Sequence, residues 1–154
     1  MSGLLGRLSQ GERIVLVAGL ALIVDLLLLP WHDIKLPAEL AAQVDTTASA
    51  VEQPYAGYGI AAVVLTALMI GQIVVAKVLA ARLPDPPVPW SQIQLILGTF
   101  VAVVLVIKLV RLTDSLGYGA YSAILAGILV AYGGYRIASE SSPPALPTQP
   151  EDRI

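Results

Sequence analysis

The sequence contains no cysteine and only one histidine, His32, in 154 residues. Without cysteine the chain has no disulfide, no thiol nucleophile, no iron–sulfur cluster and no thiolate metal site. One histidine cannot supply both axial ligands of a bis-histidine haem, or a poly-histidine metal site, from this chain alone. We therefore expect no cofactor and no metal, and the motifs that would indicate an enzyme are missing.

The sequence also contains few charged residues. Charged residues make up 13% of the chain and hydrophobic residues 56%, whereas a soluble domain usually carries about 25% charged residues. The mean hydropathy is +0.78, and the apolar residues form long runs of the kind that cross membranes. A net charge of −2 provides no basic surface for nucleic acid.

Four apolar runs, at residues 14–30, 58–81, 92–112 and 117–137, are long enough to cross the membrane. Backbone amides in lipid must be satisfied within the segment, so each run is predicted to be a helix. Ser9 and Glu12 form an S-x-x-E capping box before the first run. We predict an all-α integral membrane four-helix bundle over residues 1–138. The Pro-rich tail, residues 139–154, is expected to be cytoplasmic, and disordered unless a partner holds it.

The basic residues indicate the orientation, because Lys and Arg are enriched on the cytoplasmic side. With the N-terminus inside, six lie on the inner side and three on the outer side. The inner six are Arg7, Arg13, Lys77, Arg82, Arg136 and Arg153, and the outer three are Lys35, Lys108 and Arg111. This bias predicts a multi-pass protein of the plasma (inner) membrane with both termini in the cytoplasm.

The outer connections differ in length. Residues 31–57 form a large extracytoplasmic loop, and its apolar residues after Pro37 recur at mostly i, i+4 spacing. This spacing favours a short amphipathic helix on the outer surface, with Pro37 in its first turn. Residues 113–116 are the whole connection between the third and fourth spans, so those helices are predicted to be antiparallel neighbours. Asp114 or Ser115 is the expected cap of the fourth helix.

Asp25 lies within the first span, where a carboxylate costs about 2.5–3.5 kcal/mol and normally faces protein or water. It lies roughly 7.5 Å below the outer end of its helix, and Lys108 lies roughly 6 Å below the same boundary on the third span. Arg111 follows Lys108 on the same helix face. The matched depths predict an intramembrane ion pair of Asp25 with Lys108 or Arg111. The pair would fix helix one against helix three or form a proton or substrate site; otherwise the side chains snorkel to the interface.

His32 and Asp33 follow the first span at the outer membrane surface and form a candidate outer-surface site. A His–Asp pair at this position would act as acid and base, or bind a metal. Catalysis also requires a nucleophile and an oxyanion donor, which the neighbouring sequence does not supply. The alternative is an amphipathic interfacial histidine with no chemical role.

The fourth span carries a small residue at every fourth position, which predicts a helix-packing interface. These residues are Gly119, Ala123, Gly127 and Ala131. Such a face packs either within the four-helix bundle or against another subunit, and the pattern does not identify the partner. Ala67 and Gly71 give the second span a shorter face of the same kind. Thr66 and Gln72 are its deep polar residues and are expected to hydrogen-bond a neighbouring helix.

The first and last spans resemble those of the small, uncharacterised four-span membrane proteins of high-GC Gram-positive bacteria. The similarity lies in Leu29-Pro30-Trp31-His32 and in Gly119-Ala120-Tyr121 through Gly133-Gly134-Tyr135. It extends over most of the chain and implies a membrane location. The position of Asp25 in the first span resembles that of the acidic residue of the small multidrug transporters. Those proteins are shorter and often balanced in charge across the membrane, whereas this chain has a six-to-three bias of basic residues and a long outer loop.

Abundant packing motifs and missing catalytic motifs favour a non-enzymatic membrane protein. We expect an accessory or scaffolding subunit of a larger membrane complex, with membrane lipids and either partner subunits or a second copy as its partners. The alternative is a small transporter or lipid-binding protein that uses an intramembrane Asp25/Lys108 site. A third hypothesis is an enzyme at the outer leaflet that uses His32 and Asp33.

Overall fold

Four helices and a two-stranded sheet make up the computed structural model, which describes residues 6, 8–33, 47–52, 55–81, 84, 86–112 and 116–141. The helices are α2 (Gln10–Leu28), α4 (Ala56–Ile73), α5 (Trp90–Arg111) and α6 (Tyr118–Glu140), and α4 continues as the π-helix η1 (Val74–Val78). The strands β1 (His32–Asp33) and β2 (Thr47–Ala48) pair antiparallel. The prediction of a helical protein is confirmed, because every described element longer than two residues is a helix.

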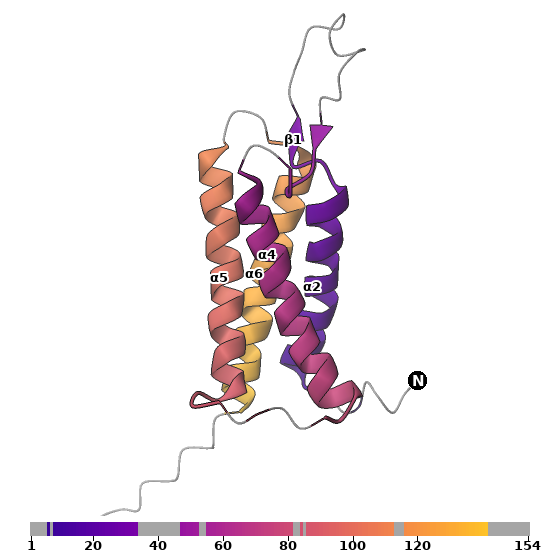
Figure 1. Cartoon of the computed structure of the whole chain (residues 1–154), viewed down its shortest axis with the longest axis vertical. Helices are drawn as coiled ribbons and strands as arrows, with labels where there is room; N and C mark the ends of the chain where they lie inside the picture. The colour runs from indigo at the N-terminus through magenta and orange to yellow at the C-terminus, as the bar shows by residue number, and fades with distance from the viewer. Residues whose placement is uncertain are drawn as a thin grey trace, which may run out of the picture.

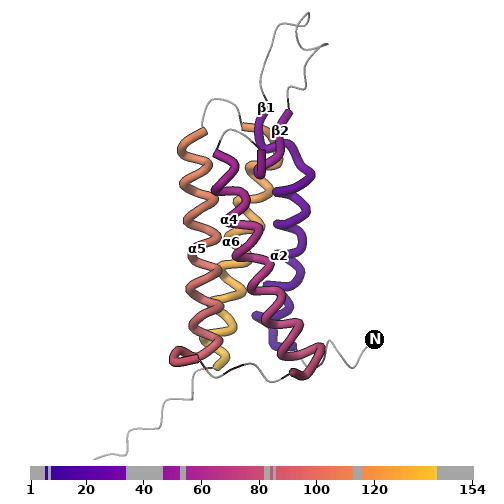
Figure 2. The backbone as a smooth tube through the Cα atoms, viewed as in Figure 1, coloured from indigo at the N-terminus to yellow at the C-terminus, as the bar shows by residue number. Residues whose placement is uncertain are grey.

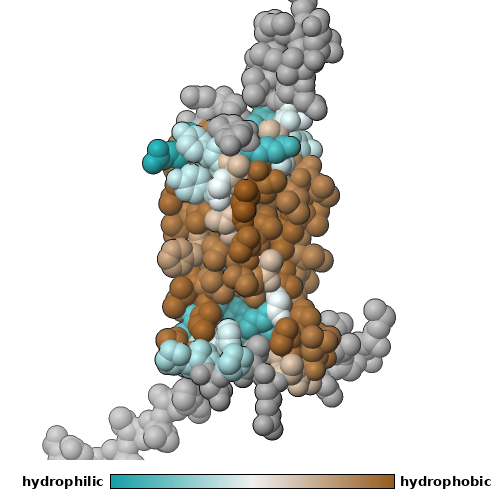
Figure 3. Space-filling model, in the orientation of Figure 1, coloured by the Kyte–Doolittle hydropathy of each residue, from teal (hydrophilic) through white to brown (hydrophobic). Residues whose placement is uncertain are grey.

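Three helical segments in the described part of the chain are long and apolar enough to cross a membrane: Ala56–Val78, Trp90–Arg111 and Tyr118–Glu140. α2 lies beside them but carries Glu12, Arg13 and Asp25, so its crossing of the membrane stays a prediction. Figure 3 shows a broad apolar band between two polar ends on the visible face of the molecule. This is the surface expected of helices surrounded by lipid.

The helices lie side by side, with α4 and α6 each contacting both α2 and α5 (Figure 1). The contacts of α6 with α2 and α5 are the most extensive, and the α2–α4 contact is the sparsest. Contacting helices run antiparallel, so the first turn of α2 and the last turn of α6 meet at one end, here called the termini end. The opposite end, here called the hairpin end, holds β1 and β2 (Figure 2). The core side chains include Val15, Leu22, Leu26, Met69, Val101, Leu105 and Val130.

The small residues of α6 bring its backbone close to both neighbouring helices. A Cβ added to Gly119 would lie 2.8 Å from the carbonyl oxygen of Pro30, and one added to Gly127 would lie 2.5 Å from Leu105 Cδ1. Ala123 is fully buried, and the Cα of Ala131 lies 3.1 Å from the Cβ position of Gly98 on α5. The predicted packing face is therefore occupied by helices of the same chain, which leaves it unavailable to another subunit.

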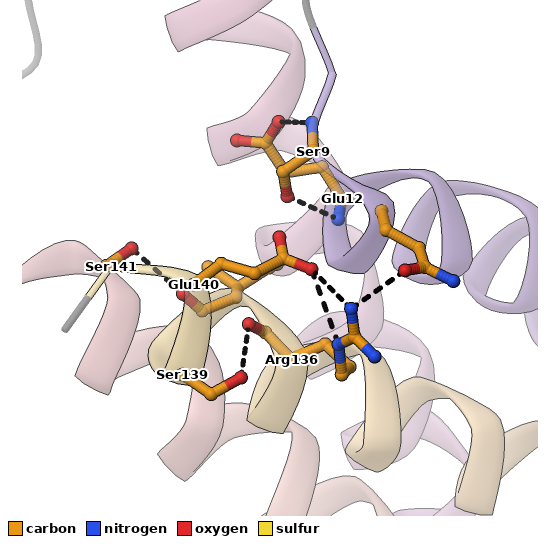
Figure 4. A network of polar contacts seen from close by, with 8 residues as sticks. Ser9, Glu12, Arg136, Ser139, Glu140 and Ser141 are labelled. Carbon is orange, nitrogen blue, oxygen red and sulfur yellow. Dashed lines mark hydrogen bonds and ion pairs between the residues drawn. The ribbon is translucent and has the colours of Figure 1, made fainter. Parts of the chain in front are cut away.

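Polar contacts hold the termini end together. The predicted capping box is confirmed, because the Ser9 amide donates to Glu12 Oε2 at 2.8 Å and the Glu12 amide donates to Ser9 Oγ at 3.3 Å (Figure 4). Arg136 of α6 pairs with Glu140 at 3.1 Å and donates to Gln10 Oε1 of α2 at 2.7 Å (Figure 4). These bonds join the first turn of α2 to the last turn of α6.

The structure corrects two expectations about the outer connections. Residues 34–46, where the amphipathic helix was expected to begin, lie outside the described residues. Its expected continuation, residues 47–51, is strand β2 followed by a turn. Asp114 and Ser115 also lie outside the described residues, and the N-cap of α6 is Gly117. The amide of Gly117 donates to the Trp31 carbonyl at 2.8 Å. The end of α2 therefore fixes where α6 begins.

Gly134→Ala is expected to destabilise the protein by about 1–3 kcal/mol, since overpacking a tight contact has costs of this size. Its Cβ would lie 2.7 Å from the Gln94 carbonyl oxygen on α5. Gly71→Ala is the matched control, because its Cβ meets nothing within 4 Å and alanine favours a helix over glycine by about 1 kcal/mol. Thermal unfolding in mild detergent measures both. Equal stability of the two variants would contradict the close approach of α6 to α5.

Candidate functional site

Lys108, near the end of α5, is completely buried at the hairpin end. Its Nζ donates to the carbonyl oxygen of Ala50 and lies 5.3 Å from the centroid of the Trp31 ring, a distance at which the ring face attracts a cation. The Ala50 amide donates to the Leu26 carbonyl of α2 at 3.1 Å. Ala50 thus joins α2 to α5, and its carbonyl also abuts Gly59 of α4, where a Cβ would collide with it.

The structure corrects the predicted ion pair. Neither Lys108 nor Arg111 pairs with Asp25 in the part of the chain that is described. Asp25 is buried, its carboxyl group interacts with the Ser122 side chain of α6, and its Oδ1 has no hydrogen-bond partner in the structure. Arg111 is exposed. The depths of Asp25 and Lys108 were matched, but α2 packs against α4 and α6, so the face of α2 that carries Asp25 does not meet α5.

His32 is also placed differently from the prediction. Its side chain is 1% exposed, whereas Asp33 is exposed. Neighbouring residues of a strand point to opposite faces, so the two side chains do not form an acid–base pair. Both ring nitrogens of His32 lack a hydrogen-bond partner in the structure, and its backbone pairs with Ala48 and Leu116. The candidate outer-surface site is therefore replaced by a buried histidine beneath the hairpin.

Burial is the main cause that lowers the pKa of His32, and the Lys108 cation lowers it further, while Glu52 opposes the change. The ring is therefore neutral at neutral pH. The hairpin end therefore encloses one cation and one neutral imidazole among four buried residues: Trp31, His32, Ala50 and Lys108. No group of three or more His, Cys, Asp or Glu side chains among the described residues is arranged to hold a metal ion.

A second candidate site lies between α4 and α5, toward the termini end. Gln94 of α5 is 1% exposed, and its Nε2 donates to the Met69 carbonyl at 3.1 Å and to Gln72 Oε1 of α4. The expectation that Gln72 bonds a neighbouring helix is confirmed, whereas the hydroxyl of Thr66 has no partner in the structure. The sequence analysis did not identify Gln94 as a site residue. Like Gln72, it is a lone amide in an apolar run.

A hollow of about 490 Å³ lies beside this amide pair and is here called the α4–α5 groove. Its walls are apolar except for Gln72 and the indole of Trp90, and its residues are Ala67, Leu68, Gly71, Gln72, Val75, Trp90, Ile93 and Leu97. The π-helix η1 begins at Val74, directly below Gln72, and π-helical segments in helices often occur at functional sites. The shorter small-residue face of the second span, Ala67 and Gly71, therefore opens into a groove instead of into the core.

No protein-family model, curated protein or solved structure matches the chain.

Asp25→Asn and Lys108→Met are expected to change the free energy of unfolding independently, within about 0.5 kcal/mol of additivity, because the two side chains are not partners. Lys108→Met alone should cost about 1–3 kcal/mol, because it leaves the buried Ala50 carbonyl without a donor. A double-mutant cycle measured by unfolding in detergent tests this. A coupling energy above about 1 kcal/mol would instead support an ion pair between Asp25 and Lys108.

Acidification is expected to destabilise the folded protein through His32. The pKa of His32 is lower in the folded state than its ordinary value of about 6.5, so below that pH the unfolded state binds the additional proton. Stability should therefore be full above pH of about 6.5 and fall below it by up to about 1.4 kcal/mol per pH unit. His32→Gln should remove the decrease in thermal stability below a pH of about 6.5, and Asp33→Asn should leave that decrease in place. An unchanged slope in His32→Gln would refute the assignment.

Proposed function

We propose that the chain is a four-span bundle of the plasma membrane with both termini in the cytoplasm, acting as a non-enzymatic accessory or scaffolding subunit. It would hold a transmembrane helix of a partner protein in the α4–α5 groove. The observation that carries the proposal is the groove itself, in which small residues and an amide group face the membrane. Three helices able to cross a membrane and the excess of basic residues that the sequence predicts on the inner side support the location and orientation.

The chemistry of the groove suits a helix. Helices associate in lipid through close backbone approach at small residues and through hydrogen bonds between helices. Ala67 and Gly71 supply the first feature, and the open space at Gly71 leaves room for a neighbouring backbone. Gln72 supplies the second. Its Oε1 accepts from Gln94, so its Nε2 remains to donate to a partner, and an amide donor facing lipid without an acceptor is costly.

The packing face of α6 does not serve this purpose, because α2 and α5 already cover it. The alternative of a transporter or lipid-binding protein with an Asp25/Lys108 site has less support. Lys108 is engaged by the Ala50 carbonyl, Asp25 faces Ser122 of α6, and neither residue lines the α4–α5 groove. The enzyme hypothesis loses its support because His32 is buried and separated from Asp33.

A photoreactive amino acid at Leu68, which is exposed in the groove, is expected to crosslink to one membrane protein at native expression. Ile128 of α6 is the matched control, since it is also exposed and lies at a similar depth. Gly71→Leu should reduce the Leu68 adduct by about tenfold or more by filling the groove, because overpacking costs about 1–3 kcal/mol. Gln72→Leu should reduce it about threefold, as expected for an interhelical hydrogen bond of about 0.6 kcal/mol.

Denaturing electrophoresis identifies the adduct, and an increment of 16.1 kDa would mark a second copy of this chain as the partner. Thermal unfolding of Gly71→Leu checks that folding is intact. Identical adducts from positions 68 and 128, or an adduct unaffected by Gly71→Leu, would rule out the groove as the docking site.

A further inference from the structure

The segment that covers the hairpin end is attached to the helices mainly by polar contacts. It consists of β2 and the turn after it, residues 47–52, and is here called the Ala50 turn. The Ala50 amide donates to the Leu26 carbonyl of α2 at 3.1 Å, and the Ala50 carbonyl accepts from Lys108 Nζ of α5. Pairing of β2 with β1 is a third attachment. The extensive contacts of the protein lie between helices, so the turn can separate while the bundle stays packed.

The imidazole of His32 lies beside this turn. The ring is buried, and neither of its nitrogens has a hydrogen-bond partner in the structure. Two charged groups of neighbouring elements act on it, Lys108 of α5 and Glu52 at the end of the Ala50 turn. Asp33, the other residue of β1, is exposed on the opposite face of the strand. These surroundings suit the ring only while it is neutral.

Protonation of the ring changes this balance. An imidazolium ion has two N–H donors, and the closed structure offers an acceptor to neither of them. Its charge is repelled by Lys108. Glu52 opposes this repulsion, but its carboxylate is exposed and already accepts from the Ser49 amide at 2.6 Å. An unpaired buried charge is costly, and exposure of the ring to water removes that cost. Separation of the Ala50 turn breaks fewer contacts than separation of two helices.

We propose that protonation of His32 detaches the Ala50 turn from α5 while the four helices stay packed. Detachment breaks the bond between Lys108 and the Ala50 carbonyl and exposes the ring of Trp31. The structure described above is then the closed state, and the open state presents a cation and an indole at the hairpin end. The decrease in global stability predicted above follows from any exposure of His32, whereas this switch requires opening of the turn by itself. It does not depend on the α4–α5 groove or on the proposed function.

Hydrogen–deuterium exchange of the full chain in mild detergent, measured by mass spectrometry, tests the switch. Peptides that contain the Ala50 amide report opening of the turn, and peptides from the middle of α5 and α6 report opening of the bundle. After correction for intrinsic exchange, protection of the Ala50 amide should fall about tenfold between pH of about 7.5 and about 5, because a change of one pKa unit is worth tenfold in an equilibrium. Protection in the middle of α5 and α6 should fall much less.

Three variants assign the effect to the buried ring. His32→Gln replaces it with a polar side chain that does not titrate, and should abolish the acid dependence. Asp33→Asn removes the carboxylate on the opposite face of β1, and as the matched control should leave the dependence intact. Lys108→Gln keeps an N–H donor for the Ala50 carbonyl but removes the charge beside His32. Protonation then costs less in the closed state, so the acid dependence should become smaller.

Thermal unfolding at neutral pH reports whether each variant is folded. If His32→Gln does not fold, the unmodified protein and Lys108→Gln still decide the matter. Constant protection of the Ala50 amide down to pH of about 5, or a fall that runs parallel in α5 and α6, would overturn the proposal. An acid dependence that persists in His32→Gln would overturn it as well. The Leu68 adduct is measured at neutral pH and without these variants, so failure of the switch is separable from failure of the docking site.

Discussion

Close approach of the α6 backbone to α2 and α5 is the constraint on which the arrangement of the four helices depends. In lipid, apolar side chains gain little by leaving the solvent, so association depends on van der Waals contact and hydrogen bonds between helices. Gly127 and Gly134 allow this contact with α5, and Gly119 allows it with the end of α2. Because α6 touches both helices along its length, it sets their separation, and α4 completes the arrangement through sparser contacts with α2 and fuller contacts with α5.

The buried cation at the hairpin end follows from the same arrangement. Because α4 and α6 lie between α2 and α5, the ammonium group of Lys108 meets the backbone of the segment between α2 and α4 instead of the carboxylate of Asp25. A carbonyl oxygen and an aromatic face partly replace its water. The Ala50 turn is thereby bound to three helices, and His32 is enclosed beneath it as a neutral ring. This end of the protein is thus closed by polar contacts, whereas its middle is held by apolar packing.

The longest small-residue face packs between the helices of the chain, so the surfaces left for other molecules are on the outside. The α4–α5 groove offers a hydrogen-bond donor and room for a backbone, which are properties suited to a helix.

The sequence by itself determined that the chain is helical and has segments able to cross a membrane, because these follow from the length and composition of its apolar runs. It also determined the capping box at Ser9 and Glu12, which is a local interaction. Only the tertiary structure decided that Asp25 and Lys108 lie apart, that His32 is buried and that Gly119, Ala123, Gly127 and Ala131 face inward. Residue spacing gives the depth of a side chain along its helix. The direction in which that side chain points depends on how the helix rotates to achieve close packing with its neighbours, and contacts distant in sequence determine this rotation.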